Sequence, residues 1–120
     1  MMTLSLTHRL RRLRQSPAIR NLVRETTLVP ETLVYPLFVC TGSGLRREVP
    51  SMPGVFQLSV DEVVREVEGA RQDGIRAVLL FGLPERKDDT GSGAWDDDAP
   101  VQAAVRAIKE QTSDILVITD

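Results

Sequence analysis

The sequence predicts an α/β protein built from parallel β-α-β units, and two observations lead to this fold class. Residues 32–40, 75–82 and 114–120 are short apolar runs with the composition of β-strands. Two amphipathic stretches of helical periodicity separate them, so the expected order is strand, helix, strand, helix, strand. Strands that alternate with amphipathic helices form parallel sheets. The 120 residues are 42% hydrophobic and 27% charged, which is ordinary for a globular protein.

The first segment, residues 1–31, is predicted to be a basic arm. Residues 1–24 contain six arginines and no acidic residue, whereas residues 25–120 contain nine basic and seventeen acidic residues. Such arms occur in organelle transit peptides, in nucleic-acid-binding tails and in segments that lie on another subunit. Ser16 is expected to cap a short helix that has Pro17 at its first position.

The first strand is expected over residues 32–40, buried on both faces because its apolar residues do not alternate with polar ones. Pro36 cannot donate a hydrogen bond, so it should lie at an edge or where pairing begins. Residues 42–58, with three glycines and two prolines, predict a loop that contains a short extended piece near residues 46–49.

Two helices are expected after this loop. Ser59 is the predicted N-cap of the first, Glu62 completes the pattern of a capping box, and Gly74 is placed to end the helix. Asp98 is the predicted cap of the second, with Pro100 in its first turn. The apolar stripes consist of Val60, Val63, Val64, Val67 and Ala70 in the first helix, and of Val101, Ala104, Val105 and Ile108 in the second.

A long loop, residues 81–98, joins the second strand to the second helix, where about 2–6 residues are usual. Its glycines fit neither phosphate-binding pattern, because Lys87 precedes them and residues 91–93 lack the third glycine of a dinucleotide fingerprint. The spacing does not fit an EF-hand either. A weak Mg²⁺ or Ca²⁺ site and a solvated or interface loop both remain open. Six carboxylates disfavour an anion site: Glu85, Asp88, Asp89, Asp96, Asp97 and Asp98.

Cysteine and histidine are too rare for several kinds of site. Cys40 is the only cysteine and His8 the only histidine, which excludes an internal disulfide and a cysteine-rich zinc cluster. Cys40 is interpreted as a small buried apolar residue. No apolar run approaches the roughly 20 residues of a membrane helix, and the start has no signal-peptide core. We therefore expect a cytoplasmic protein without a membrane partner.

The predicted sheet lacks a cover on one face. Right-handed crossovers place both helices on the same face, yet the strands are apolar throughout. The second face fills the interior in a closed barrel and is covered by later helices in an open doubly wound sheet. We therefore expect residues 32–120 to be the N-terminal part of a larger domain. In both architectures the active site lies at the carboxyl ends of the strands, where Asp120 is found.

Several segments, in this order and at this spacing, resemble the porphobilinogen synthase (5-aminolevulinate dehydratase) family. They are RLRRLRQSPAIR (9–20), ETTL (25–28), YPLFV (35–39), SMPGV (51–55), GIRAVLLFGLPERKDDTGSGAW (74–95) and VQAAVRAIK (101–109). The resemblance implies a (β/α)8 TIM barrel with an N-terminal arm. Residues 32–120 would supply its first three strands and two helices and leave the barrel incomplete.

The resemblance also implies a role for the arm, which wraps a neighbouring subunit in this family and helps to set a homo-oligomer, commonly an octamer. The expected subunit-interface residues are Arg9, Arg11, Arg12, Leu13 and Arg14. The alternative hypothesis is a non-catalytic module whose arginine arm binds nucleic acid or regulates the assembly of a partner. Binding of nucleic acid is disfavoured, because no aromatic residue accompanies the basic ones in the arm.

The family is a lyase of heme and other tetrapyrrole biosynthesis that joins two molecules of 5-aminolevulinate into porphobilinogen with loss of water. The resemblance implies that two lysines on later strands form Schiff bases with the substrate, and that zinc or magnesium is bound there. All these groups would lie beyond the residues of this chain. Asp120 alone matches an active-site aspartate of the family. We therefore expect no metal or cofactor ligand in this chain and no formation of porphobilinogen by this chain alone.

Overall fold

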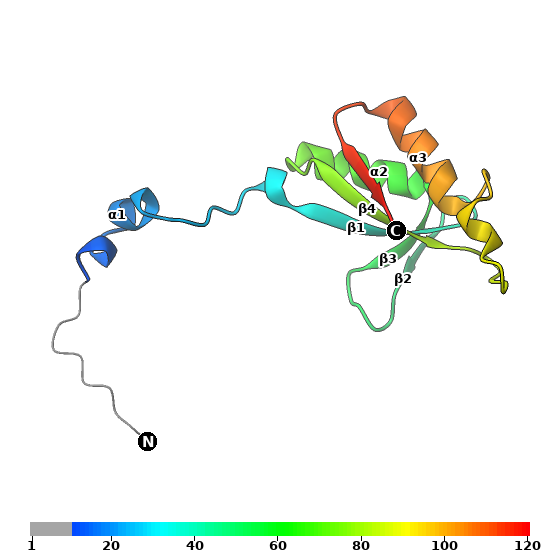
Figure 1. Cartoon of the computed structure of the whole chain (residues 1–120), viewed down its shortest axis with the longest axis horizontal. Helices are drawn as coiled ribbons and strands as arrows, with labels where there is room; N and C mark the ends of the chain where they lie inside the picture. Colours follow the sequence, from blue (N-terminus) through cyan, green and yellow to red (C-terminus); the bar gives the residue numbers. More distant parts are fainter. Residues whose placement is uncertain (1–10) are drawn as a thin grey trace, which may run out of the picture.

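The computed structural model describes residues 11–120, which form an arm and an α/β body (Figure 1). The body contains one mixed sheet and two long helices. In chain order the elements, with η for a 3-10 helix, are η1 (Arg12–Arg14), α1 (Pro17–Leu22), η2 (Pro30–Thr32), β1 (Val34–Cys40), β2 (Arg46–Glu48), β3 (Phe56–Ser59), α2 (Val60–Gln72), β4 (Ala77–Leu83), η3 (Ser92–Ala94), α3 (Pro100–Gln111) and β5 (Leu116–Thr119).

The three predicted strands form the parallel part of the sheet, whose order is β2-β3-β1-β4-β5. β1 pairs with β4 along its whole length, from Val34 opposite Ala77 to Cys40 opposite Leu83. β5 pairs with β4 on the other side, beginning with Leu116 opposite Ala77. The order of strands and helices and the parallel arrangement are therefore confirmed.

One strand was missed by the sequence analysis. Residues 56–59 form β3, which pairs in parallel with residues 38–40 of β1, although residues 56–58 were expected to belong to a loop. β3 has only four residues, too few for its alternation of Phe56 and Leu58 with polar residues to stand out from the flanking glycines and prolines. The predicted extended piece is present as β2, which is antiparallel to β3.

β1 begins two residues later than predicted. The N–H and hydroxyl of Thr32 both donate to the Val29 carbonyl, at 3.1 and 2.8 Å, and so close the 3-10 turn η2 ahead of the strand. Pro36 pairs with β4 only, because β3 begins to pair at Phe38. A residue without an N–H is tolerated where a strand has a neighbour on one side only.

α2 and α3 lie side by side on one face of the sheet and enclose the core (Figure 1). Gly82 allows α3 to approach β4 closely, because a Cβ at this position would lie 2.6 Å from Cγ2 of Val101. The helix stripes predicted from the sequence are buried or partly buried here, as expected. The buried core residues include Leu37 and Val39 of β1, Val78 and Leu80 of β4, Val63 and Val67 of α2, and Ala104 and Ile108 of α3.

Gly74 terminates α2, as predicted. Gly74 has a φ of 94°, a conformation that favours glycine, and its N–H donates to the Arg71 carbonyl at 3.1 Å. The N–H of Ile75 donates to the Ala70 carbonyl at 2.9 Å. These two hydrogen bonds form a Schellman motif, which satisfies carbonyls at the helix end and turns the chain into β4.

The predicted N-cap of α2 is confirmed in position, but its capping box and the predicted N-cap of α3 are wrong. Ser59 occupies the N-cap of α2, but its side chain accepts no hydrogen bond from the helix, and Glu62 pairs instead with Arg65. The capping box is therefore wrong, because the neighbouring loop engages the Ser59 hydroxyl. The N-cap of α3 is Ala99 rather than Asp98, which lies one residue earlier and pairs with Arg106 at 3.6 Å.

No helix of residues 11–120 covers the second face of the sheet (Figure 1). Alternate residues of the apolar strands β1 and β4 point to this face. The rings of Phe38 and Phe81 pack there with centroids 5.6 Å apart. Leu116 is 60% exposed and Ile118 is 37% exposed. The predicted bare apolar face is thus present in the described residues. None of the described helices is long and apolar enough to cross a membrane.

Candidate functional site

The parallel strands β1, β4 and β5 end at one edge of the sheet, at Cys40, Leu83 and Thr119. Asp120 follows β5 directly, and its N–H donates to the Leu80 carbonyl at 3.3 Å. This bond continues the pairing of β5 with β4 and places the Asp120 backbone at the edge. The sequence-predicted catalytic residue therefore lies where a parallel sheet presents its functional groups.

A pocket of about 430 Å³ lies at this edge. We call it the rim pocket, and it is bounded by residues 81–94, by the start of α3 and by Thr119 and Asp120. Its floor is apolar, with Phe81 and Pro84 among its lining residues. The long loop, whose role the sequence analysis left undecided, thus forms a wall of the rim pocket.

Charges of both signs line the rim pocket. Arg86 and Lys87 come from the loop, and Asp120 comes from the end of β5. Among residues 11–120, none of these three side chains takes part in an ion pair. A small molecule that carries both a carboxylate and an amine would find complementary groups here.

Asp88 gives the loop its internal order. Its carboxylate accepts hydrogen bonds from the N–H of Ser92 at 2.9 Å, from the Thr90 hydroxyl at 3.1 Å and from the Ser92 hydroxyl. The bond from the Ser92 side chain, followed by the bond from its N–H, lowers the pKa of Asp88 to about 2. Asp88 is therefore occupied in shaping the loop rather than presented to a ligand.

The interpretation of the loop as a cation site finds no support among the described residues. Within residues 11–120, no group of three or more His, Cys, Asp or Glu side chains is arranged to hold a metal ion. Asp96 contributes an Asx-type turn, since its Oδ1 accepts from the N–H of Asp98 at 2.9 Å. The carboxylates of this loop lie in successive turns and do not converge on one point.

A second loop at the same edge, residues 41–45, is held by hydrogen bonds to the side chains of Ser59 and Asp61. The Ser59 side chain is fully buried, and its Oγ accepts from the N–H of Leu45 at 2.9 Å and donates to Oδ1 of Asp61 at 2.6 Å. The Asp61 carboxylate accepts from the N–H of Gly44, with Oδ2 at 2.9 Å. The bonds from Ser59 and then Gly44 lower the pKa of Asp61.

The β2–β3 hairpin is attached to the body through Glu66 of α2. Its two carboxylate oxygens accept from the Tyr35 hydroxyl at 2.7 Å and from Arg46 at 2.8 Å. Arg46 also stacks over the Phe56 ring, 4.3 Å from its centroid. The bond from Arg46 lowers the pKa of Glu66, whereas burial and the bond to Glu66 raise the pKa of Tyr35 to about 12. All three polar groups are satisfied, so this cluster is structural.

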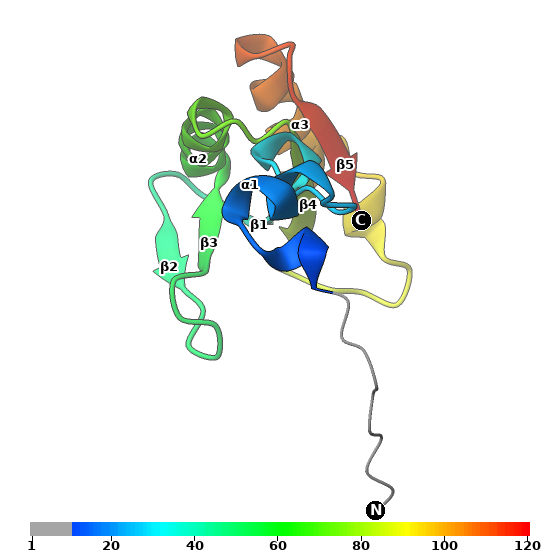
Figure 2. The same cartoon turned by 90° about the vertical axis from the view of Figure 1, so that its left-hand side faces the viewer.

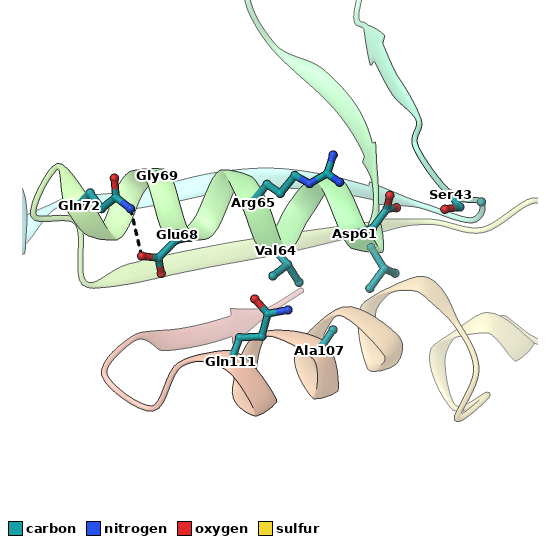
Figure 3. A pocket seen from close by; sticks show the side chains of 11 residues that line it. Ser43, Asp61, Val64, Arg65, Glu68, Gly69, Gln72, Ala107 and Gln111 are labelled. Carbon is teal, nitrogen blue, oxygen red and sulfur yellow. Dashed lines mark hydrogen bonds between the residues drawn. The ribbon is translucent and has the colours of Figure 1, made fainter.

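A larger groove, of about 890 Å³, lies between α2 and α3 and extends to Gly42 and Ser43 in the loop after β1 (Figure 3). Figure 3 shows Val64 and Ala107 between the two helices, with Glu68 and Gln72 bonded to each other on α2. Glu68 also pairs with Arg71 at 2.9 Å. Because its acids are already paired and it is open to solvent, this groove is a weaker candidate for chemistry than the rim pocket, despite its size.

The arm lies apart from the sheet, and Figure 2 shows α1 from the side on which the arm projects. Ser16 caps α1, since its Oγ accepts from the N–H of Ile19 at 3.2 Å, and Pro17 is the first helical residue, as predicted. Arg11, Arg12, Leu13 and Arg14 are all exposed, while Arg9 lies outside the described residues. In residues 11–120 no arginine of the arm pairs with a carboxylate.

The family model for delta-aminolevulinic acid dehydratase matches residues 7–120. The chain belongs to the delta-aminolevulinic acid dehydratase family. A dehydratase of this name from Synechocystis is 50% identical over 114 residues, which cover 95% of this chain and 35% of the relative. Another from Halalkalibacterium halodurans is 52% identical over 110 residues, which cover 92% of this chain and 34% of the relative. The chain thus spans about a third of the length of these relatives.

A solved structure confirms the predicted fold class. It is the delta-aminolevulinic acid dehydratase (porphobilinogen synthase) of Toxoplasma gondii in complex with the reaction product porphobilinogen. It matches this chain with a TM-score of 0.82 and 35% identity, over 98% of this chain and 34% of that chain. The sheet and helices described above are therefore a third of the TIM barrel of the dehydratase family. In such a barrel the face opposite the helices fills the interior, and Phe38 and Phe81 lie on that face.

Two features of the site were not predicted from the sequence. The hydrogen bond between Ser59 and Asp61 was not predicted, because the sequence pattern indicated a capping box with Glu62 instead. The only sequence feature that indicates this bond is an acidic residue two positions after the serine. Gln102, which lines the rim pocket, gave no signal in the sequence. The assignments of Asp120 to catalysis and of the arm to subunit contacts remain predictions.

Proposed function

We propose that this chain supplies the first third of a porphobilinogen synthase, which condenses two molecules of 5-aminolevulinate into porphobilinogen with loss of water. The observation that supports this most directly is the rim pocket. It lies at the carboxyl edge of a sheet whose structural relative was solved with porphobilinogen. Active sites of TIM barrels are found at this edge.

The charges of the rim pocket suit the proposed substrate. 5-Aminolevulinate carries a carboxylate and an amine, and the pocket offers the cations Arg86 and Lys87 as well as the carboxylate of Asp120. A carboxylate at this place can hold the amine by a hydrogen bond or accept a proton from it. We assign this role to Asp120.

Other groups needed for the reaction are expected outside this chain. The Schiff-base lysines implied by the resemblance belong to later strands. Metal dependence is general in the family, but the described residues contain no fitting ligand set. We therefore derive no step of the reaction through a metal on this chain, and the choice between zinc and magnesium rests with residues elsewhere in the complete polypeptide.

The exposed arm supports a homo-oligomer, for which we propose the octamer. Leu13 is 61% exposed and Leu22 is 85% exposed, and the arm arginines described here have no carboxylate partner within residues 11–120. Apolar and cationic side chains presented together need a partner surface. No specific observation favours the alternative of a non-catalytic arginine-arm module.

The proposal is tested by assaying the complete polypeptide for porphobilinogen formed from 5-aminolevulinate, with zinc or magnesium added, and by measuring its mass in solution. We expect turnover and an octamer. The 120-residue chain, assayed beside it, is expected to form no product. If the complete polypeptide formed no porphobilinogen with either metal, the proposed function would be wrong. If residues 1–120 alone formed porphobilinogen, our proposal that groups needed for the reaction lie outside this chain would be wrong.

A further inference from the structure

Gln102 connects the long loop to α3 by a contact that crosses eight residues of sequence. It lies in the first turn of α3, and its Nε2 donates to the Ala94 carbonyl at 2.8 Å. Gln102 also lines the rim pocket. The same side chain therefore contacts both the loop and the pocket that the loop encloses.

Apart from the N–H of Ala99, the N-cap of α3, which donates to the Asp96 carbonyl at 3.0 Å, the remaining hydrogen bonds of residues 84–98 stay within the loop in the described structure. Ala94 donates to the Gly91 carbonyl at 2.9 Å, and Asp96 donates to the Ser92 carbonyl at 3.2 Å. Among the described residues, the only other link to α3 through side chains is the Asp98–Arg106 pair at 3.6 Å, in which the Asp98 side chain is 96% exposed. An ion pair of that exposure contributes little, so the Gln102 bond is the main side-chain attachment of the loop to α3.

Packing alone does not account for a glutamine at this position. Its Oε1 is buried and has no hydrogen-bond partner among the described residues. An unpartnered buried acceptor is costly, and an apolar side chain of similar size would avoid that cost. The property that glutamine adds is the donor that holds Ala94.

We propose that Gln102 is a positioning residue of the rim pocket. Its amide fixes the loop against α3 and thereby sets where Arg86 and Lys87 stand relative to Asp120. The inference rests on the proposed function, because it concerns the site for 5-aminolevulinate. It adds a residue that acts on the site through the loop.

The test uses the complete polypeptide and four variants. Gln102→Leu removes the donor at similar size. Gln111→Leu is the matched control, because Gln111 is an exposed glutamine at the other end of the same helix and makes no hydrogen bond through its side chain in the described structure. Trp95, next to Ala94, is labelled as 5-fluorotryptophan, and its fluorine resonance is assigned with Trp95→Phe.

We expect Gln102→Leu to raise KM for 5-aminolevulinate about tenfold, the effect of one lost hydrogen bond, with a much smaller change in kcat. The fluorine resonance of Trp95 should shift or broaden in this variant. Gln111→Leu should leave KM and the resonance unchanged. Circular dichroism of each variant shows whether it is folded.

The variant Gln102→Glu tests whether the side chain of residue 102 acts as a hydrogen-bond donor to Ala94 or only by its packing. A protonated glutamic acid can donate to Ala94 and an ionised one cannot, so the Trp95 resonance of this variant should approach that of wild type as the pH falls toward about 4. Wild type, titrated in parallel, corrects for the charged groups that the two proteins share at this site: Arg86, Lys87, Asp88, Asp96, Asp98, Arg106 and Asp120.

An unchanged KM and an unchanged resonance in Gln102→Leu would overturn the inference. A raised KM with an unchanged resonance would also overturn it, since Gln102 would then act on the substrate directly. If wild type forms no porphobilinogen, the proposed function fails separately. The fluorine and pH measurements then still decide whether Gln102 holds the loop.

Discussion

The hydroxyl of Ser59 donates to the carboxylate of Asp61 at 2.6 Å, and each of the two residues also accepts a backbone N–H of the loop after β1. Leu45 is bound by Ser59, and Gly44 is bound by Asp61. The start of α2 therefore holds a loop at the carboxyl edge of the sheet in place. What the sequence presents as a helix cap is in the structure an attachment point for that loop.

Asp61→Ala is expected to lower the melting temperature of the complete polypeptide near neutral pH. The pKa of Asp61 is lowered in the folded state, so its ionised form contributes stability above the unfolded-state value, about 3.9. That contribution is lost as the pH falls through the folded-state pKa. The difference in melting temperature between wild type and variant should therefore shrink below about pH 4. Asp97→Ala, at an exposed carboxylate without a hydrogen-bond or ion-pair partner among the described residues, should show no such dependence.

Gly82→Ala is expected to destabilise the protein by about 1–3 kcal/mol, because the new Cβ overpacks the contact with α3. It would meet Cγ2 of Val101 at 2.6 Å, in the first turn of that helix. Gly69→Ala is the control, since Gly69 lies inside α2 with open space around its missing Cβ. This control should be stabilising by about 0.5–1 kcal/mol. Thermal unfolding measures both, and an equal effect of the two substitutions would contradict the prediction.

Elements built on clear apolar runs or helical stripes could be predicted from the sequence, whereas β3 could not. The strands and helices around Val39, Val67, Leu80 and Ile108 carry enough apolar residues for their period to be read, and all of these residues are buried. β3 has four residues and no period that stands out from its loop. The sheet was therefore predicted without β3, the strand that lies between β2 and β1.

Side-chain partners in the site were harder to predict than the place of the site. Asp120 could be placed at the carboxyl edge because it follows an apolar strand directly. Gln102 could not be connected to Ala94, because that contact depends on the turns between them. The same limit explains the error at Asp98, since the extended backbone of Ala99 places the start of α3 one residue later.

Tyr35→Phe is expected to destabilise the protein by about 0.5–1.5 kcal/mol, the usual contribution of one hydrogen bond. The Tyr35 hydroxyl donates to Glu66 at 2.7 Å, and the pKa of Tyr35 is raised to about 12. The bond is therefore present below the unfolded-state value of about 10 and is lost as the pH rises through about 12. The difference in phenolate absorption between wild type and Tyr35→Phe follows this titration. A midpoint near pH 10 would show that the bond does not form.

Asp120→Asn is expected to lower kcat of the complete polypeptide by about 10²–10⁴, because an amide cannot accept a proton from the substrate amine. The change keeps the size of the side chain and the backbone bond to Leu80, so the fold and the melting temperature should be preserved. Asp98→Asn is the control, at a carboxylate that is 96% exposed and does not line the rim pocket. Full activity of Asp120→Asn in the porphobilinogen assay would exclude Asp120 from the chemistry, and the carboxyl edge would then contribute binding alone.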